Sequence, residues 1–158
     1  MKLLVLSDSH GRVGMLEKAY ETHPDTDMIV FLGDGLRDIS RAFTGCEKTV
    51  VCVRGNCDGI TFDTSFAAHA LQETVLELEG VRVLCCHGHR YGVKSGLSTI
   101  AEYAASKNIQ LVLYGHTHTP AETRCGGAVL FNPGSVSTGS YGIVYLKDGA
   151  VLCSHGEV

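Results

Sequence analysis

The feature that most constrains the fold is an alternation of short apolar runs with helical stretches. Residues 13–23, 35–43 and 95–108 have helical patterns, and the last carries an apolar stripe of Leu97, Ile100, Ala101 and Ala104. The apolar runs before and between them are nearly continuous, as strands buried on both faces are. These runs are residues 3–6, 28–32, 49–53, 81–86 and 111–114. Strand-helix-strand alternation predicts an α/β sheet with right-handed crossovers.

The pattern changes in the last fifth of the chain. Residues 128–131, 142–146 and 150–154 are strand-like and are joined by Gly and Asn-Pro-Gly turns. The tetrad Lys147-Asp148-Gly149-Ala150 is typical of a hairpin turn. We expect this part to form an antiparallel sheet that packs against the first. The predicted fold class is therefore α/β, a two-sheet sandwich with flanking helices in a single domain over residues 1–158.

Composition fits one globular domain and narrows its partners. The chain has 158 residues, 44% apolar and 19% charged, which is enough for a proper core. The first apolar run is too short for a signal sequence, and none approaches the roughly 20 residues of a membrane span. We therefore expect a cytoplasmic protein that does not bind membranes. The net charge of -4 leaves no basic face, which argues against binding to duplex nucleic acid.

The cysteines favour the same compartment. There are seven of them, an odd number, and they form no C-x-x-C pair. Most lie among strand-like residues, such as Cys85 and Cys86. Reduced thiols in a cytoplasmic protein explain this usage better than a disulfide framework.

Polar residues of the kind that bind metals follow each of the five apolar runs. Because the carboxyl ends of parallel strands meet at one crevice, we expect these residues to form one site. Each motif alone has a simpler explanation, such as a helix cap at Asp8 or a turn at Asn56. Their shared position after strands and beside glycines favours the single site. The motifs are Asp8-Ser9-His10, Gly33-Asp34, Gly55-Asn56-Cys57-Asp58, His87-Gly88-His89 and Gly115-His116-Thr117-His118.

The types of side chain indicate the chemistry of this site. Carboxylates and imidazoles without cysteine at the main positions suit Mn²⁺, Fe, Ni²⁺, Co²⁺ or catalytic Zn²⁺. Two divalent ions would leave a cluster that contains Asp8 and Asp34 at about +2, a charge that suits a phosphate ester. Two ions about 3.5–4 Å apart bind phosphoryl oxygens and lower the pKa of a shared water for in-line attack. The remaining histidines, His23, His69 and His155, have no such support and are expected to be surface residues or polar residues with hydrogen-bond partners.

As an ordered set, these motifs resemble the calcineurin-like metallophosphoesterases, and Asn132-Pro133-Gly134-Ser135 extends the likeness. The short chain and the Gly-Asn-Cys-Asp form resemble the small YfcE-type phosphodiesterases, the branch that includes the retromer scaffold subunit. The resemblance implies an α/β sandwich that hydrolyses phosphodiesters with two divalent ions, of which Mn²⁺ is our first expectation. It also implies that Asn56 touches a phosphate oxygen and that His89 lines the substrate pocket. The implied ligands of one ion are Asp8, His10, Asp34 and His118, and those of the other are Asp34, Asn56, His87 and His116, with Asp34 as the bridge.

Cys57 departs from the wider family, which has a histidine there that assists the leaving group. A thiol has an ordinary pKa of about 8.5, and two nearby cations should lower it, so we expect a thiolate. A thiolate is a poor proton donor. Aryl, nucleotide-type or otherwise activated diesters should therefore be better substrates than alkyl esters.

Two rival functions remain at this point. One is a non-catalytic, metal-binding scaffold of the same fold, and the other is a metal-sensing domain. The presence of all seven ligand-type residues favours the enzyme over the scaffold. The sequence leaves open the physiological substrate, the native metal, the hydrolysis of monoesters, and whether the chain forms a homo-oligomer.

Overall fold

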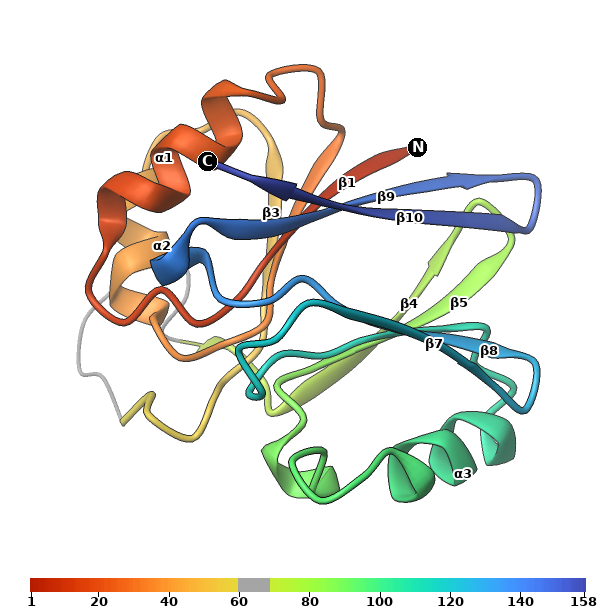
Figure 1. Cartoon of the computed structure of the whole chain (residues 1–158). Helices are drawn as coiled ribbons and strands as arrows, with labels where there is room; N and C mark the ends of the chain where they lie inside the picture. Colours follow the sequence, from red (N-terminus) through yellow and green to blue (C-terminus); the bar gives the residue numbers. More distant parts are fainter. Residues whose placement is uncertain (60–68) are drawn as a thin grey trace.

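Two five-stranded sheets lie face to face, and helices cover their outer faces (Figure 1). This computed structural model describes residues 1–59 and 69–158. The predicted two-sheet α/β sandwich is confirmed.

The first sheet combines the N-terminal strands with the C-terminal hairpin in the order β10-β9-β1-β2-β3. β1, β2 and β3 run parallel, with Leu3 opposite Met28, and β9 pairs antiparallel with β1. Helices α1 and α2 make the two crossovers and cover one face (Figure 1). The bounds are β1 Lys2–Leu6, α1 Val13–Glu21, β2 Met28–Phe31, α2 Leu36–Phe43, β3 Thr49–Cys52, β9 Ser140–Lys147 and β10 Ala150–Glu157.

The second sheet has the order β4-β5-β6-β8-β7. Its three central strands β5, β6 and β8 are parallel, and the edge strands β4 and β7 are antiparallel to their neighbours. Helix α3 covers its outer face (Figure 1). The bounds are β4 Glu73–Leu78, β5 Val81–Cys86, α3 Ser98–Ser106, β6 Leu111–Leu113, β7 Ala121–Cys125 and β8 Ala128–Asn132. Two short 3₁₀ turns, η2 (His89–Tyr91) and η3 (Val136–Thr138), follow β5 and β8.

The last part of the chain does not form a separate antiparallel sheet, and that expectation was wrong. β9 and β10 extend the first sheet, whereas β8 lies inside the second sheet, parallel to β6. All five residues of β8 are buried, so this strand needs a neighbour on each side, and only the long-range pairing shows which neighbours it has. The sequence analysis also missed the edge strands β4 and β7: no residue of either strand is fully buried, and most of β7 is exposed.

Each strand of the sandwich buries alternate side chains in different layers. Leu3 and Val5 of β1 lie in the core between the sheets, together with Val83 and Phe131 of the second sheet. Leu4, on the opposite face of β1, packs in the layer beneath α1 and α2. A third layer lies beneath α3. This two-residue periodicity explains why the central strands are apolar at nearly every position.

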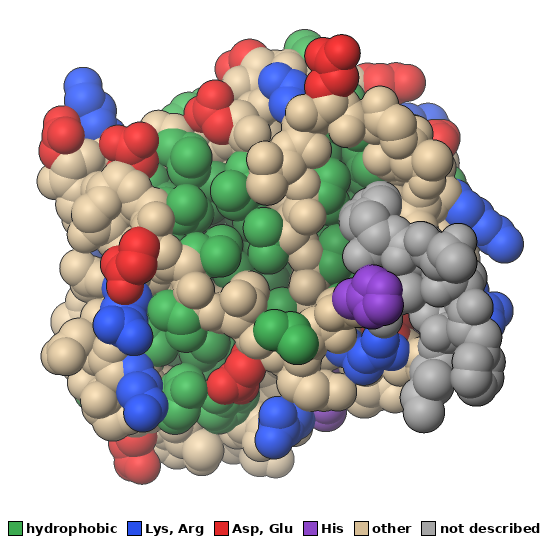
Figure 2. All heavy atoms as spheres, turned by 180° about the vertical axis from the view of Figure 1, so that it is seen from behind, with side chains coloured by type: hydrophobic (Ala, Val, Ile, Leu, Met, Phe, Trp, Pro, Cys, Tyr) green, Lys and Arg blue, Asp and Glu red, His purple; other side chains and the backbone are tan. Residues whose placement is uncertain are grey.

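The surface carries mixed charge, as a net charge of -4 suggests. Seen from behind, acidic and basic side chains are interspersed around exposed hydrophobic ones (Figure 2). Leu71 and Val75, near the β3 and β4 edges, are among the exposed apolar residues of the molecule. No helix in the described ranges is long and apolar enough to cross a membrane. All seven cysteines are free thiols.

Candidate metal centre

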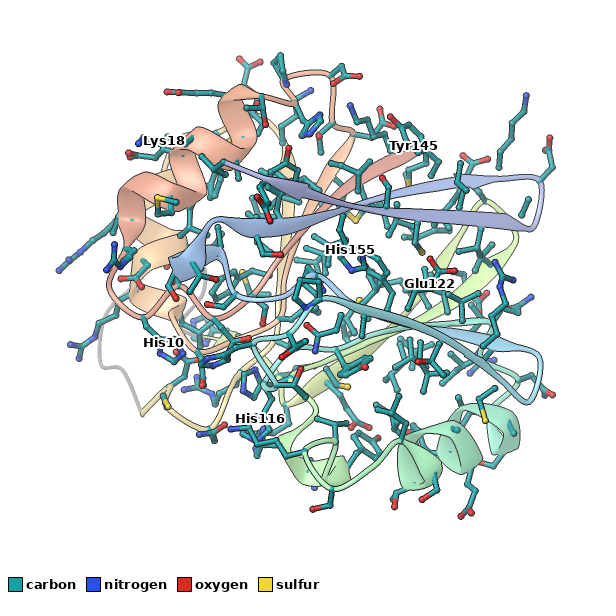
Figure 3. The ribbon with its side chains drawn as sticks, in the orientation of Figure 1. His10, Lys18, His116, Glu122, Tyr145 and His155 are labelled. Atoms are coloured by element: carbon teal, nitrogen blue, oxygen red, sulfur yellow. The ribbon has the colours of Figure 1, made fainter. Side chains whose placement is uncertain are left out.

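The segments that follow β1, β2, β3, β5 and β6 meet at one end of the sandwich. Figure 3 shows His10 and His116 close together there, one from each sheet, whereas Lys18 and Tyr145 lie elsewhere. The predicted crevice is thus formed by both sheets and not by the edge of one. It contains all seven predicted ligand residues, whose roles as ligands remain a prediction.

The first cluster of ligand-type atoms consists of Asp8, His10 and His118, which lie within 4.8 Å of one another. Asp8 Oδ1 is 3.1 Å from His118 Nε2 and 3.7 Å from His10 Nε2, and the two imidazole nitrogens are 3.2 Å apart. Asp8 is fully buried, and its Oδ1 accepts no hydrogen bond from the described residues. A buried carboxylate oxygen is costly without a partner, so this geometry fits a cation between the three side chains.

The second cluster consists of Asp34, His87 and His116. His87 Nε2 is 3.4 Å from Asp34 Oδ2, 3.2 Å from His116 Nδ1 and 3.1 Å from Asn56 Oδ1. His87 Nδ1 is 2.7 Å from the Leu32 carbonyl oxygen, which can only accept. The proton of a neutral His87 therefore lies on Nδ1, and the Nε2 lone pair faces the cluster, as a metal-binding imidazole requires.

Burial and neighbouring groups have opposite effects on the pKa values of Asp34 and His87. Burial disfavours the ionised form of Asp34, but the His87 side chain and the Cys57 N–H hold the pKa of Asp34 well below its ordinary value. Burial likewise disfavours the charged form of His87, but Asp34 and Asp8 outweigh it and raise the His87 pKa. Burial and the neighbouring His87 lower the pKa of His116. The negative charge of these carboxylates favours a proton on the buried imidazole, and it would equally favour a bound cation.

Backbone strain concentrates at these residues. Among the described residues, eight other than glycine have positive φ, and five of the eight are predicted ligands. Such conformations are uncommon, and they persist where the surrounding structure imposes them, often at functional sites. The five are Asp8 (56°), His10 (44°), Asp34 (58°), His116 (68°) and His118 (61°).

Glycines allow the loops to approach closely. A Cβ on Gly55 would lie 2.1 Å from Asp34 Oδ1, and one on Gly33 would lie 2.5 Å from the Gly55 nitrogen. At the β6 loop, a Cβ on Gly115 would lie 2.0 Å from Ser7 Oγ. A side chain at any of these positions would push the ligand loops apart.

Three polar residues that the sequence analysis did not single out hold the loops in place. Asp58 accepts hydrogen bonds from four backbone N–H groups, those of Asp34, Gly35, Leu36 and Gly55, at 2.7–2.9 Å. It thereby ties the Asp34 loop to the Asn56 loop. The sequence showed Asp58 only as the last residue of the Gly-Asn-Cys-Asp motif. Its role could not be predicted, because its partners are main-chain groups that no sequence pattern identifies.

The other two residues act on the remaining loops. Asp38 of α2 accepts from Ser9 Oγ at 2.6 Å and from the Gly11 N–H at 2.7 Å, which fixes the loop that carries His10. Asn132 donates to the Gly115 carbonyl at 2.9 Å and to Thr117 Oγ1 at 3.0 Å. These bonds hold the segment between His116 and His118, and they give the Asn-Pro-Gly-Ser motif a structural role.

Cys57 and His89 flank the two clusters. The Cys57 N–H donates to Asp34 Oδ1 at 2.8 Å, and the exposed thiol lies close enough to Asp34 for that carboxylate to raise its pKa. The expected thiolate therefore depends on bound cations. The His89 ring lies 5.4 Å from that of His87, and its buried Nδ1 takes no hydrogen bond from the described residues.

A cavity of about 360 Å³ opens beside the clusters. It lies on the side of the first sheet, next to Cys57 and the start of α2. Its lining residues are His10, Gly11, Asp34, Gly35, Leu36, Arg37, Asp38, Cys57, Asp58 and Gly59.

Comparison with known proteins decides the family. Residues 1–149 match the family described as the Calcineurin-like phosphoesterase superfamily domain. The chain belongs to this superfamily. Among the calcineurin-like phosphoesterases, it is 29% identical over 157 residues to "Probable metallophosphoesterase YsnB" from Bacillus subtilis, covering 95% of this chain and 87% of that protein. It is 30% identical over 155 residues to "Phosphodiesterase YfcE" from Escherichia coli, covering 87% of this chain and 80% of YfcE.

Solved structures share the fold. A predicted phosphoesterase from Streptococcus pneumoniae superposes with a TM-score of 0.79 at 25% identity, covering 99% of this chain and 88% of that one. Vacuolar Protein Sorting 29 from Cryptosporidium parvum shares the fold, with a TM-score of 0.75 at 14% identity over 99% of this chain and 97% of that one. The chain is thus a phosphoesterase of the YfcE-type branch, a hydrolase that acts on phosphoric esters.

Proposed function

We propose that the protein is a phosphodiesterase that holds two divalent cations and hydrolyses small diesters with activated or nucleotide-type leaving groups. The observation that carries this proposal is a pair of adjoining ligand clusters, one around Asp8 and one around His87. Each contains residues from both sheets, and Asp8 Oδ1 lies 3.9 Å from His87 Nε2. In one cluster, the buried Asp8 Oδ1 accepts no hydrogen bond from residues 1–59 and 69–158, and in the other an imidazole lone pair is directed inward. Both features support cation binding.

Asp34 is the proposed bridging ligand. Its ligand atoms belong to the cluster with His87 and His116, and they also lie within 4.8 Å of the ligand atoms of His10 and Cys57. The proposed residues for one ion are Asp8, His10, Asp34 and His118, and those for the other are Asp34, Asn56, His87 and His116. The donor set of oxygen and imidazole nitrogen suits Mn²⁺ first, with Ni²⁺, Fe, Co²⁺ or Zn²⁺ as alternatives.

Bound cations would supply Lewis-acid chemistry: charge neutralisation at the phosphoryl group and a lower pKa for a water molecule. The chain supplies orientation. The Leu32 carbonyl fixes the His87 tautomer, and Asp58 keeps the loops of Asp34 and Asn56 together. In this proposal Asn56 donates from its amide to a phosphoryl oxygen, and His89 contacts the ester from the second sheet.

The cavity gives a diester room that a monoester does not need. It adjoins His10, Asp34 and Cys57, and Arg37 also lines it. One ester arm fits on this side, with the phosphate at the clusters. Cys57 then lies beside the leaving oxygen, at the position where the wider family has a histidine that can donate a proton.

A non-catalytic scaffold is the second candidate, because the fold is shared with Vacuolar Protein Sorting 29. Full retention of the seven ligand-type residues, together with the enzyme relatives, favours catalysis. Free thiols and the lack of a membrane-spanning helix in the described residues are compatible with the cytoplasm as the proposed location.

A panel of metal-reconstituted assays tests the proposal. Aryl and nucleotide diesters are compared with the matching monoesters after reconstitution with Mn²⁺, Ni²⁺, Co²⁺ or Zn²⁺. We expect diester hydrolysis that needs added metal and exceeds that of the monoesters. Metal-loaded protein with no turnover of any ester would favour the scaffold, and faster monoester turnover would contradict the substrate class.

A further inference from the structure

Cys57 lies where it can reach the metal centre directly. The ligand atoms of His10, Asp34 and Cys57 lie within 4.8 Å of one another, a third cluster beside the two described above. Among the described residues, Cys57 is the one cysteine of the seven that joins a cluster of this kind. The proposed roles of Cys57 so far concern only the leaving group of the substrate.

Hydrogen bonds hold the backbone of Cys57 in place, so its thiol stays within side-chain reach of the centre. The Cys57 N–H donates to Asp34 Oδ1 at 2.8 Å, and Asp58, the next residue, is bound to four backbone N–H groups. Asn56 Nδ2 lies 3.4 Å from the Cys57 sulfur. The thiol therefore lies between two proposed ligands, Asp34 and Asn56.

Sulfur discriminates between metals more sharply than the other donors of the centre. Thiolates favour Zn²⁺ and other thiophilic ions, whereas carboxylate and water oxygens suit Mn²⁺. Zinc binds sulfur at about 2.3 Å and imidazole nitrogen at about 2.0–2.1 Å, so donors of one ion lie within about 4 Å of one another. A small side-chain rotation brings the three ligand atoms from the observed spacing into this range.

We propose that Cys57 is a conditional metal ligand: it binds Zn²⁺, Co²⁺ or Cd²⁺ held by His10 and Asp34, and it leaves Mn²⁺ uncoordinated. On binding, the thiol loses its proton to solvent and the sulfur forms a bond to the ion. The centre then has two states, which differ in whether this sulfur is free.

The location of Cys57 gives the two states different consequences for substrates. His10, Asp34 and Cys57 all line the 360 Å³ cavity proposed for an ester arm. A sulfur that binds an ion together with His10 and Asp34 would no longer face the leaving group in this cavity. The zinc form should therefore bind diesters less well than the manganese form. This inference rests on the proposed ion binding by His10 and Asp34, but not on catalysis.

Cobalt spectroscopy of the full chain tests the proposal. A thiolate bound to Co²⁺ gives a sulfur-to-metal charge-transfer band in the near ultraviolet, which oxygen and nitrogen donors do not give. We expect this band in Co²⁺-loaded wild type and its loss in Cys57→Ser with cobalt content unchanged. Cys125→Ser is the matched control, since Cys125 is also exposed but lies on β7, and it should keep the band.

Competition between metals gives a second measurement. Cys57→Ser should lower the affinity for Zn²⁺ relative to Mn²⁺ by about 10-fold or more, and Cys125→Ser should not. Cobalt-loaded wild type without the band, or a band that survives Cys57→Ser, would overturn the inference. Mn²⁺-dependent diesterase activity without the band would refute only this inference, whereas the band without any activity would refute only the proposed function.

Discussion

At the scale of single residues, Asp34 contacts several parts of the centre at once. Its backbone N–H binds Asp58, its Oδ1 accepts from Cys57, and its Oδ2 faces His87. It also holds a φ of 58° and is 3% exposed. For the proposed bridging ligand, we expect the charge of the side chain to matter more than its volume.

Asp34→Asn should therefore reduce occupancy from two ions to at most one per chain and lower diesterase kcat/KM at least about 10²-fold. The amide keeps the shape but removes the charge that a bridging ligand shares between two cations. Elemental analysis of the reconstituted protein measures the occupancy. Asp148→Asn, in the exposed β9–β10 turn, is the matched control and should bind metal as wild type does. Two ions in Asp34→Asn would show that another residue bridges.

Cys57→His should flatten the dependence of rate on the pKa of the leaving group. An imidazole can donate the proton that a thiolate cannot, and general acid catalysis is worth about 10²–10⁴-fold where the leaving group needs it. The gain should fall mainly on alkyl diesters. Measurement of kcat/KM over diesters with graded leaving groups, with metal content confirmed, decides this. A uniform loss for every substrate would mean that Cys57 only packs against the Asn56 loop.

The meeting of the ligand-type residues at one end of the sandwich could be predicted, because each motif follows a strand and contains or adjoins a glycine. The residues that position them could not. Asp38 reads as an ordinary helix residue, although it binds Ser9 and Gly11 across the site. Its partners lie in one loop, between β1 and α1, which only the fold brings next to α2.

At the scale of elements, the loops of the centre depend on carboxylates that bind backbone amides. Asp58→Asn replaces one of the two acceptor oxygens that face four N–H groups by a donor NH₂ group. We expect the free energy of unfolding to fall by about 1–3 kcal/mol and the metal affinity to fall by about 10–100-fold. Chemical denaturation of apo protein and metal titration measure these two losses. Asp148→Asn again serves as the control. Unchanged metal affinity would show that the loops hold their positions without Asp58.

A second prediction concerns the opposite end of β1, where His23 joins three elements. His23 Nδ1 is 3.3 Å from Lys2 Nζ, and its Nε2 is 3.0 Å from the Tyr141 hydroxyl. Since the ammonium can only donate, Nδ1 accepts and the ring is neutral. Burial and the Lys2 charge lower the pKa of His23 below its ordinary value of 6.5.

A folded-state pKa below the unfolded one means that the unfolded chain binds the proton more readily. This contribution to stability is present above pH 6.5 and is lost as the pH falls through the folded pKa. His23→Gln should remove this part of the loss of stability at low pH. The fall in Tm between pH 7.5 and 5.5 should then be smaller than in wild type, by no more than about 2 °C, because solvent screens a partly exposed group. His69→Gln, at an exposed histidine, is the control. An identical pH dependence in His23→Gln and wild type would exclude the effect.

The elements themselves were predictable to different degrees. β5 was predicted at its observed bounds, because a buried central strand has a continuous apolar run. β7 could not be predicted, since four of its five residues, Glu122 to Cys125, are exposed and the strand exists through its pairing with β8. β8 was identified but assigned to the wrong sheet, because local sequence does not specify which distant strand it joins.

At the scale of the whole molecule, the centre lies where two sheets meet and belongs to neither alone. Asp8 and Asp34 come from the first sheet, and His87 and His116 from the second. Cations that bind both sets link the sheets, so metal binding and stability of the fold should be coupled.

The most direct test of the account is a titration of Mn²⁺ into chelator-treated protein, with bound metal per chain and aryl diesterase rate measured on the same samples. The account predicts two ions per chain and a rate that rises with the second ion. Full activity with one ion, or activity that persists in chelator with no bound metal, would contradict it.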